Sequence, residues 1–253
     1  MESEPAFVEV LTDEEIAVLA RPGGIVVSPY LTTLEDGQVE LARRTAYRSL
    51  LARGVVDPPT PEAVGRALDA RDGSVDLPVR QDVLTVMTLR RSARAVVAVA
   101  RTTSLTQDFW YAHLVEDVLL IEQVSGDGLH RFALAHDHQL ADLVVDTAMA
   151  PEAGDAAGEP VPLEVDPQDP TPPTAVSEAL GEALVRSDVV VRYVGDQDPP
   201  LLGMFTGPGG CWLVTARPGS TPVAEPLAAE ELRRRIHDLV GQSRAEVNTL
   251  ARG

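Results

Sequence analysis

One stretch of the chain, residues 95–149, limits the fold more than any other. It contains four runs rich in β-branched and aromatic residues, followed by a segment with apolar residues at helical spacing. The runs span residues 95–101, 109–115, 117–124 and 129–134. The stretch therefore predicts antiparallel strands that close onto a helix.

A similar unit returns near the C-terminus. Its apolar runs span residues 188–193, 200–205 and 211–215, and a helical pattern follows them. Both units end in a Leu-Ala step, Leu134-Ala135 and Leu227-Ala228, that leads into a polar first turn and then spaced aliphatic residues. The shared order predicts an internal duplication, and chance similarity of two sheet-and-helix units is the alternative.

Capping and stop signals indicate the other elements. Thr12 followed by Glu15 has the pattern of a capping box, and Thr60-Pro61 places a cap before a proline at the first helical position. The predicted helices cover residues 12–20, 36–54, 60–71, 177–186 and 230–250, and residues 25–27 are predicted to form a short strand. Residues 82–93 have mixed signals: the spacing of Val83, Leu84 and Met87 suits a helix, whereas β-branched residues between them favour a strand, and of the two we favour a helix.

Residues 151–174 separate the two units. They contain seven prolines, six acidic residues and no basic residue. With few apolar groups to bury, this segment is expected to be a linker or exposed loop, extended or disordered. The predicted organisation is an N-terminal half (1–150), this linker (151–174) and a C-terminal half (175–253) that packs with the first as one globular unit.

The net charge of the chain limits which classes of partner it can bind. The formal net charge is −18, and all 21 basic residues are arginine, which is typical of a GC-rich, for example actinobacterial, genome. Such a charge repels phosphate backbones and anionic lipid surfaces, so we expect no nucleic-acid partner. No run approaches the roughly 20 apolar residues of a bilayer span, and the start lacks signal-peptide features. We therefore expect a cytoplasmic protein without membrane insertion.

The tripeptide His136-Asp137-His138 has the residue types of a metal or acid–base site, which His113 and Glu116 are placed to complete. A metal-dependent hydrolase is therefore one alternative function. No His-Glu-x-x-His motif accompanies the tripeptide, and the second unit has Ala229-Glu230-Glu231 at the same point, so a helix start is the simpler interpretation. His130 and His237 are predicted to lie on a sheet surface and a helix surface.

Other candidates have structural explanations. Arg43, Arg44 and Arg48 on the helix 36–54 suggest a DNA-binding regulator as a second alternative, but a solvated helix face also explains them. Because Cys211 is the single cysteine, an intramolecular disulfide is excluded. Cys211 is predicted to be a small buried residue with a packing role. The glycine-rich stretch 207–210 is predicted to be a hairpin turn, since no helix follows it directly.

Four diffuse motifs together resemble the EspG family of actinobacterial ESX (type VII) secretion-associated proteins. They are Leu11-Thr12-Asp13-Glu14-Glu15, Leu50-Leu51-Ala52-Arg53-Gly54-Val55-Val56, Gly128-Leu129-His130-Arg131-Phe132-Ala133-Leu134-Ala135, and Trp212-Leu213-Val214 before a last helix. The resemblance spans most of the chain. It implies an α+β fold with a central antiparallel β-sheet, flanking helices and two pseudo-symmetric halves.

The resemblance also implies a non-enzymatic cytosolic chaperone for a helical, aggregation-prone secretion substrate of PE–PPE or related type. No catalytic residue, metal or cofactor is expected, and the oligomeric state stays open, a homo-oligomer included. No family motif fixes the contact residues, so the candidates rest on physical grounds: Leu105 between two strands, and Leu239 and Val240 late in the final helix. Core packing is the alternative for the helix pair. The acidic insert 151–174 departs from the family pattern and leaves the client undetermined.

Overall fold

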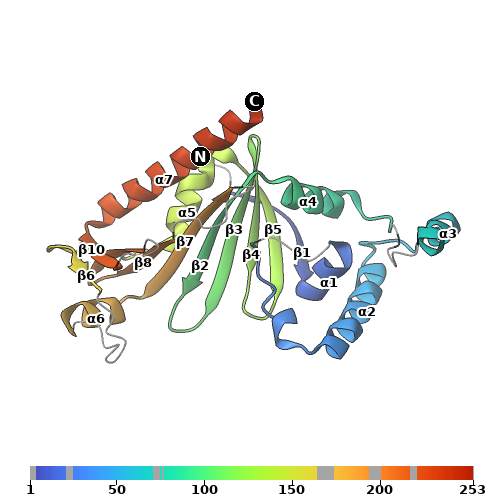
Figure 1. Cartoon of the computed structure of the whole chain (residues 1–253), viewed down its shortest axis with the longest axis horizontal. Coiled ribbons are helices and arrows are strands. Elements are labelled where there is room, and N and C mark those ends of the chain that lie inside the picture. Colours follow the sequence, from blue (N-terminus) through green and yellow to red (C-terminus); the bar gives the residue numbers. More distant parts are fainter. Residues whose placement is uncertain are drawn as a thin grey trace.

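The fold is built on one large antiparallel sheet (Figure 1). A computed structural model describes residues 4–20, 25–70, 75, 77–163, 174–193, 201–216 and 221–252. Within them, ten strands follow the order β1-β5-β4-β3-β2-β7-β8-β9-β10-β6. The chain is therefore α+β with a central antiparallel sheet, as expected.

Seven of the described strands, β2–β5 and β7–β9, follow the apolar runs of the sequence. Their bounds are β1 (Ala6–Thr12), β2 (Ala95–Thr102), β3 (Gln107–Val115), β4 (Val118–Val124), β5 (Leu129–His136), β6 (Val161–Pro162), β7 (Val185–Tyr193), β8 (Leu201–Gly207), β9 (Gly210–Ala216) and β10 (Val223–Leu227). The helices are α1 (Asp13–Leu19), α2 (Asp36–Ala52), α3 (Pro61–Ala70), α4 (Gln81–Ser92), α5 (Leu140–Ala148), α6 (Thr174–Gly181) and α7 (Ala229–Arg252), with short 3₁₀ helices η1 (Leu31–Thr33) and η2 (Asp137–Gln139).

The two sequence units meet at the centre of the sheet. Strands β2 and β7 pair from Ala95↔Tyr193 to Thr102↔Arg186, which joins both halves into one continuous sheet. From this seam the order is β2-β3-β4-β5 on one side and β7-β8-β9-β10 on the other, and each run leads to a helix, α5 or α7. The internal duplication and the pseudo-symmetry of the two halves stay predictions.

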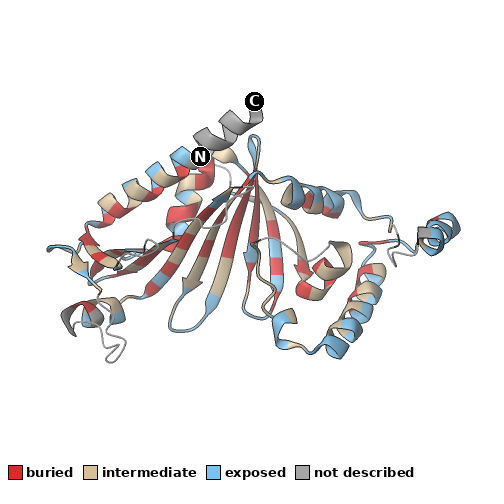
Figure 2. Ribbon diagram, viewed as in Figure 1, coloured by how far each residue is buried: buried red, intermediate tan, exposed pale blue. Residues whose placement is uncertain are grey.

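Helices cover the two faces unequally. Helices α5 and α7 lie side by side on one face, where they enclose the larger core with residues such as Val97, Val189 and Leu213. Helices α1, α2 and α4 gather at the β1 end on the other face, over a second core around Leu120 and Phe132. Figure 2 shows α3 standing apart from the sheet and largely exposed.

Several boundaries differ from the prediction. Residues 25–27 form no strand, and the helix expected over 177–186 ends at Gly181, because Val185 already begins the long pairing of β7. Strands β1 and β10 were not predicted. The stretch 82–93, which had mixed signals, forms helix α4.

The first part of the acidic segment is integrated in the fold. Its strand β6 pairs with β10, and the backbone N–H groups of Gly154 and Ala156 donate to Gly207 and Leu227 at 2.9 Å. Residues 151–163 are thus fastened to the C-terminal half; residues 164–173 of the predicted linker lie outside the described residues, and Thr174 begins helix α6.

Candidate partner-binding surface

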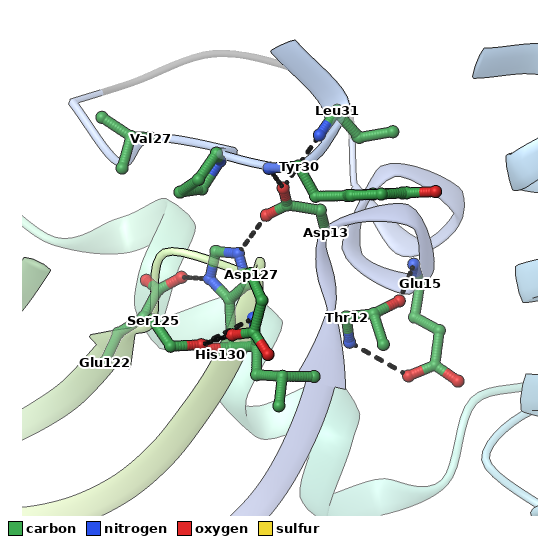
Figure 3. A network of polar contacts seen from close by, with 12 residues as sticks. Thr12, Asp13, Glu15, Val27, Tyr30, Leu31, Glu122, Ser125, Asp127 and His130 are labelled. Carbon is green, nitrogen blue, oxygen red and sulfur yellow. Dashed lines mark hydrogen bonds and ion pairs between the residues drawn. The ribbon is translucent and has the colours of Figure 1, made fainter. Parts of the chain in front are cut away.

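A buried polar network fixes the N-terminal helices to the sheet (Figure 3). His130 on β5 contacts Asp13 at the start of α1 through Nε2 (2.6 Å) and Glu122 on β4 through Nδ1 (2.7 Å). Glu122 also accepts hydrogen bonds from His113 (2.8 Å) and Arg90 (2.9 Å). These contacts join α1, α4 and three strands around one carboxylate.

The network requires a charged imidazole. Both ring nitrogens of His130 lie against carboxylate oxygens, which only accept hydrogen bonds when ionised, so both nitrogens must carry protons. Burial disfavours the charged form of His130, but the bonds to Asp13 and Glu122 outweigh it and raise its pKa. Burial likewise opposes ionisation of Glu122, yet the bonds from His113 and His130 and the charge of Arg90 hold its pKa well below the usual range.

A second group of ion pairs closes the outer edge of β1. The Arg53 guanidinium binds Glu15 on α1 (2.7 Å), Glu9 (2.9 Å) and the Val10 carbonyl (2.9 Å), and Arg80 also pairs with Glu9. Glu15 forms the predicted capping box with Thr12. Because these side chains occupy the strand edge, they oppose pairing with another chain.

The motif segments of the sequence resemblance meet in this region. Asp13, Arg53 and His130 come from three different motifs, and the Asp13 N–H donates to the Gly128 carbonyl at 2.9 Å. Asp13, Glu122, His113 and His130 are all at most 2% exposed, so no substrate reaches them. The network is a structural element; the prediction that His130 lies on a sheet surface is wrong.

An apolar surface lies on the second face of the sheet, over β2 and three strands of the C-terminal half; we call it the open face. It is the side of β2, β7, β8 and β9 opposite α5 and α7. Within the described residues, the helices that pack closely on β2, β7 and β9 are α5 and α7. The apolar members of the open face are Val96, Ala98, Ala100, Val190, Leu201, Phe205, Trp212 and Val214.

These residues form an apolar surface outside both hydrophobic cores. Leu201 is 42% exposed and the others are half-buried, and none belongs to either core cluster. Residues 182–184, after α6, border this surface where they pass over Gly207. Large apolar surface patches are often interaction sites, so this face is a candidate binding surface.

The hairpin between β2 and β3 carries a second apolar element beside the open face. Leu105 at its tip is 91% exposed. The Thr103 hydroxyl accepts hydrogen bonds from the backbone N–H groups of Leu105 (3.3 Å) and Thr106 (3.1 Å), and the Thr103 N–H donates to the Thr106 carbonyl (2.9 Å). The leucine is therefore displayed on an ordered turn.

The two other predicted contact residues have a different environment. Val240 is 1% exposed and belongs to the larger core, and Leu239 is half-buried and packs against that core. Burial leaves Val240 no free surface, so its assignment as a contact residue is corrected to core packing. The structure does not bring Leu239 and Val240 together with Leu105 in one exposed patch.

The predicted enzyme-like tripeptide lies at a helix start. His136 caps η2 through reciprocal bonds with Gln139, and the His136 and His138 rings stack with centroids 5.5 Å apart. His113 instead contacts buried Glu122, and Glu116 occupies a turn with φ of 52°. Across the described ranges, no group of three His, Cys, Asp or Glu residues is arranged to hold a metal ion. His237 is half-exposed, 3.3 Å from Asp142.

The arginines of α2 serve partly local roles. Arg44 pairs with Glu40 one turn away at 2.9 Å, while Arg48 is exposed. Cys211 is fully buried, which raises the pKa of its thiol and agrees with the packing role predicted for it. In the part of the chain that the structure describes, no helix is long and apolar enough to cross a membrane.

Sequence reasoning missed the open face, although a signal was present. Strands that face solvent on one side alternate apolar and polar residues, but residues 95–100 and 189–191 are apolar at every position. Such runs indicate strands covered on both faces. Among the described residues, helices α5 and α7 pack on one of these faces.

Comparisons with known proteins find likeness at the level of structure only. No protein-family model and no curated protein matches the chain. Among solved structures, it is similar to the Mycobacterium tuberculosis type VII secretion system chaperone EspG5, determined in complex with a PE25–PPE41 dimer. The sequence identity is 15%, the match covers 76% of this chain and 91% of that chain, and the TM-score is 0.43.

Proposed function

We propose that this protein is a cytosolic chaperone or adaptor that binds a helical, aggregation-prone type VII secretion substrate of PE–PPE or related type before export. The open face carries this proposal. Its apolar side chains lie on a ten-stranded sheet, and Leu105 is exposed on the hairpin that joins β2 to β3. Covering the open face and Leu105 would favour binding of a partner with an apolar surface, because the burial of apolar area is the main driving force of association.

The charge of the chain supports the same role. A net charge of −18 keeps a complex dispersed while its partner's apolar surface is covered. The sequence resemblance supplies the class of client. The polar network and the ion pairs at β1 serve the scaffold, so the function is assigned to a surface and not to a reactive centre.

Co-expression tests the proposal. The chain is produced with PE–PPE-type proteins encoded near its gene, and the mixture is analysed by size-exclusion chromatography with light scattering. We expect co-elution in a fixed stoichiometry. If no such candidate associates with the wild-type chain, the proposed function is wrong.

Surface variants locate the contact. Leu201→Asp on the open face and Leu105→Asp on the hairpin should each weaken the complex at least about tenfold, because each places a charge in the apolar contact. Leu68→Asp on α3 is the matched control, since Leu68 is 73% exposed but lies on the outlying helix. Equal loss of binding in the control would contradict the assignment to the open face.

A further inference from the structure

One carboxylate lies in the middle of the open face. Asp188 on β7 pairs across the strands with Ala100 on β2 and Gly203 on β8. A Cβ at Gly203 would lie 3.5 Å from both the Asp188 Oδ1 and the Val214 Cβ, so the carboxylate extends over the glycine toward an apolar neighbour. Asp188 is thus a charged residue inside an apolar surface.

Its own chain neutralises this carboxylate only weakly. Arg186 Nη2 lies 3.5 Å from Asp188 Oδ2, which is long for a charge-assisted hydrogen bond. The Arg186 guanidinium also lies over the Phe205 ring, 5.5 Å from its centroid. Within the described residues, Oδ1 accepts no hydrogen bond. The Asp188 side chain is 30% exposed.

The shape of the surface fits a helix. Ala98 and Ala100 on β2 and Gly203 on β8 form a low strip, with the larger Phe109 on β3 and Val214 on β9 beyond it. Four strand spacings separate β3 from β9 in the sheet order, about 19 Å at the usual interval. Between side chains of that size, an α-helix about 10–12 Å wide has room to lie along the strip.

We propose that the helix which docks on the open face carries an arginine or lysine within its apolar side, and that Asp188 accepts a hydrogen bond from it. This inference rests on the proposed function and specifies the partner's chemistry. A wholly apolar helix would desolvate Asp188 without supplying a donor, which is costly. A helix with an acidic residue at that point would be rejected. Asp188 therefore selects among amphipathic helices.

Designed peptides serve as the probe. Two helical peptides of about 20 residues share one Leu-rich face and differ only at its centre, where one has arginine and the other has its neutral isostere citrulline. Their affinities for the full chain are measured by fluorescence anisotropy. We expect the arginine peptide to bind at least about tenfold tighter, because citrulline can still donate a hydrogen bond but leaves the charge of the covered Asp188 carboxylate unpaired.

Two variants separate this contact from general attraction to an acidic chain. Asp188→Asn should reduce the arginine preference to about one. Asp238→Asn removes the same charge from an exposed position on α7 and should keep the preference. A preference that persists in Asp188→Asn would overturn the inference, as would its equal loss in both variants. Thermal unfolding of each variant verifies that it is folded.

The outcomes also distinguish this inference from the proposed function. If both peptides bind the wild-type chain equally and Leu201→Asp abolishes both, the open face binds helices but Asp188 does not select them. If neither peptide binds, helix docking on the open face is wrong and this inference fails with it.

Discussion

Gly128 shows how one residue position supports the polar network. Its φ is +79°, and a Cβ there would lie 2.8 Å from Asp13 Oδ2 and from the Tyr30 Cβ. We predict that Gly128→Ala lowers the free energy of unfolding by roughly 2–4 kcal/mol. Alanine is strained at this positive φ, and its Cβ would displace Asp13 from His130. Urea denaturation measures the change.

Gly65 provides the matched control for this substitution. It lies within α3, where an added Cβ meets nothing within 4 Å. Gly65→Ala should be neutral or stabilising by up to about 1 kcal/mol, since alanine favours the helix. A Gly128→Ala variant as stable as Gly65→Ala would contradict the role given to Gly128.

Individual residues were the hardest features to predict from the sequence. The bond between Asp13 and His130 joins positions 117 residues apart, and nothing local to either indicates the other. Asp13 was recognised as part of a helix start, which is correct, but its carboxylate also organises the backbone of Tyr30 and Leu31. Val240 was misjudged for the same reason, because only the packing of α7 on the sheet decides which of its residues are covered.

At the scale of elements, the β2–β3 hairpin tests whether an ordered turn around Leu105 strengthens partner binding. Thr103→Val keeps the shape of the side chain but removes the hydroxyl that accepts from Leu105 and Thr106. Because the hairpin is exposed, we expect stability to change by less than about 0.5 kcal/mol. Partner affinity should nevertheless fall about threefold to tenfold, since binding must then order the tip.

Ser104→Ala is the control for this prediction, because Ser104 lies in the same exposed turn. It should leave the affinity for the partner or for the helical peptides unchanged, as measured by the same anisotropy titration. Undiminished binding by Thr103→Val would show that the ordered turn is irrelevant to the contact.

Elements with strong local patterns were predicted well, and the misses have physical causes. The capping box at Thr12 and the four strands of the first unit follow from sequence periodicity. Strand β10 contains Pro226, which argues against a strand, but β6 pairs only with Val223 and Ala224, so the proline falls where β10 has a neighbour on one side. Helix α6 is shortened by β7, whose pairing with β2 outweighs local helix propensity.

At the scale of the whole molecule, the two faces of the sheet have different structural roles. The face under α5 and α7 supplies the larger core, and the polar network anchors α1 and α4 at one end of the other face. This arrangement leaves the C-terminal part of that second face free of the N-terminal helices. The sequence predicted an α+β sheet protein, but the unequal cover of its faces is a property of the assembled fold.

The network also predicts how the stability of the whole chain depends on pH. The pKa of His130 is raised in the folded chain above its ordinary value of 6.5, so its contribution is complete below pH 6.5 and is lost as the pH rises through the folded value. The pKa of Glu122 is lowered from 4.5, so its contribution is complete above pH 4.5 and is lost as the pH falls through the folded value. Both contributions are complete only between pH 4.5 and 6.5.

The free energy of unfolding should therefore decrease from about pH 6 to about pH 9, as measured by urea denaturation at each pH. NMR of the folded chain gives an independent check, because both nitrogens of the His130 ring should stay protonated above pH 6.5. Loss of a His130 proton near pH 6.5, together with equal stability at both pH values, would refute the charged network. Glu122→Gln removes the central anion and should cost about 3–5 kcal/mol at pH 6, since Arg90 loses its carboxylate partner and His130 keeps only Asp13.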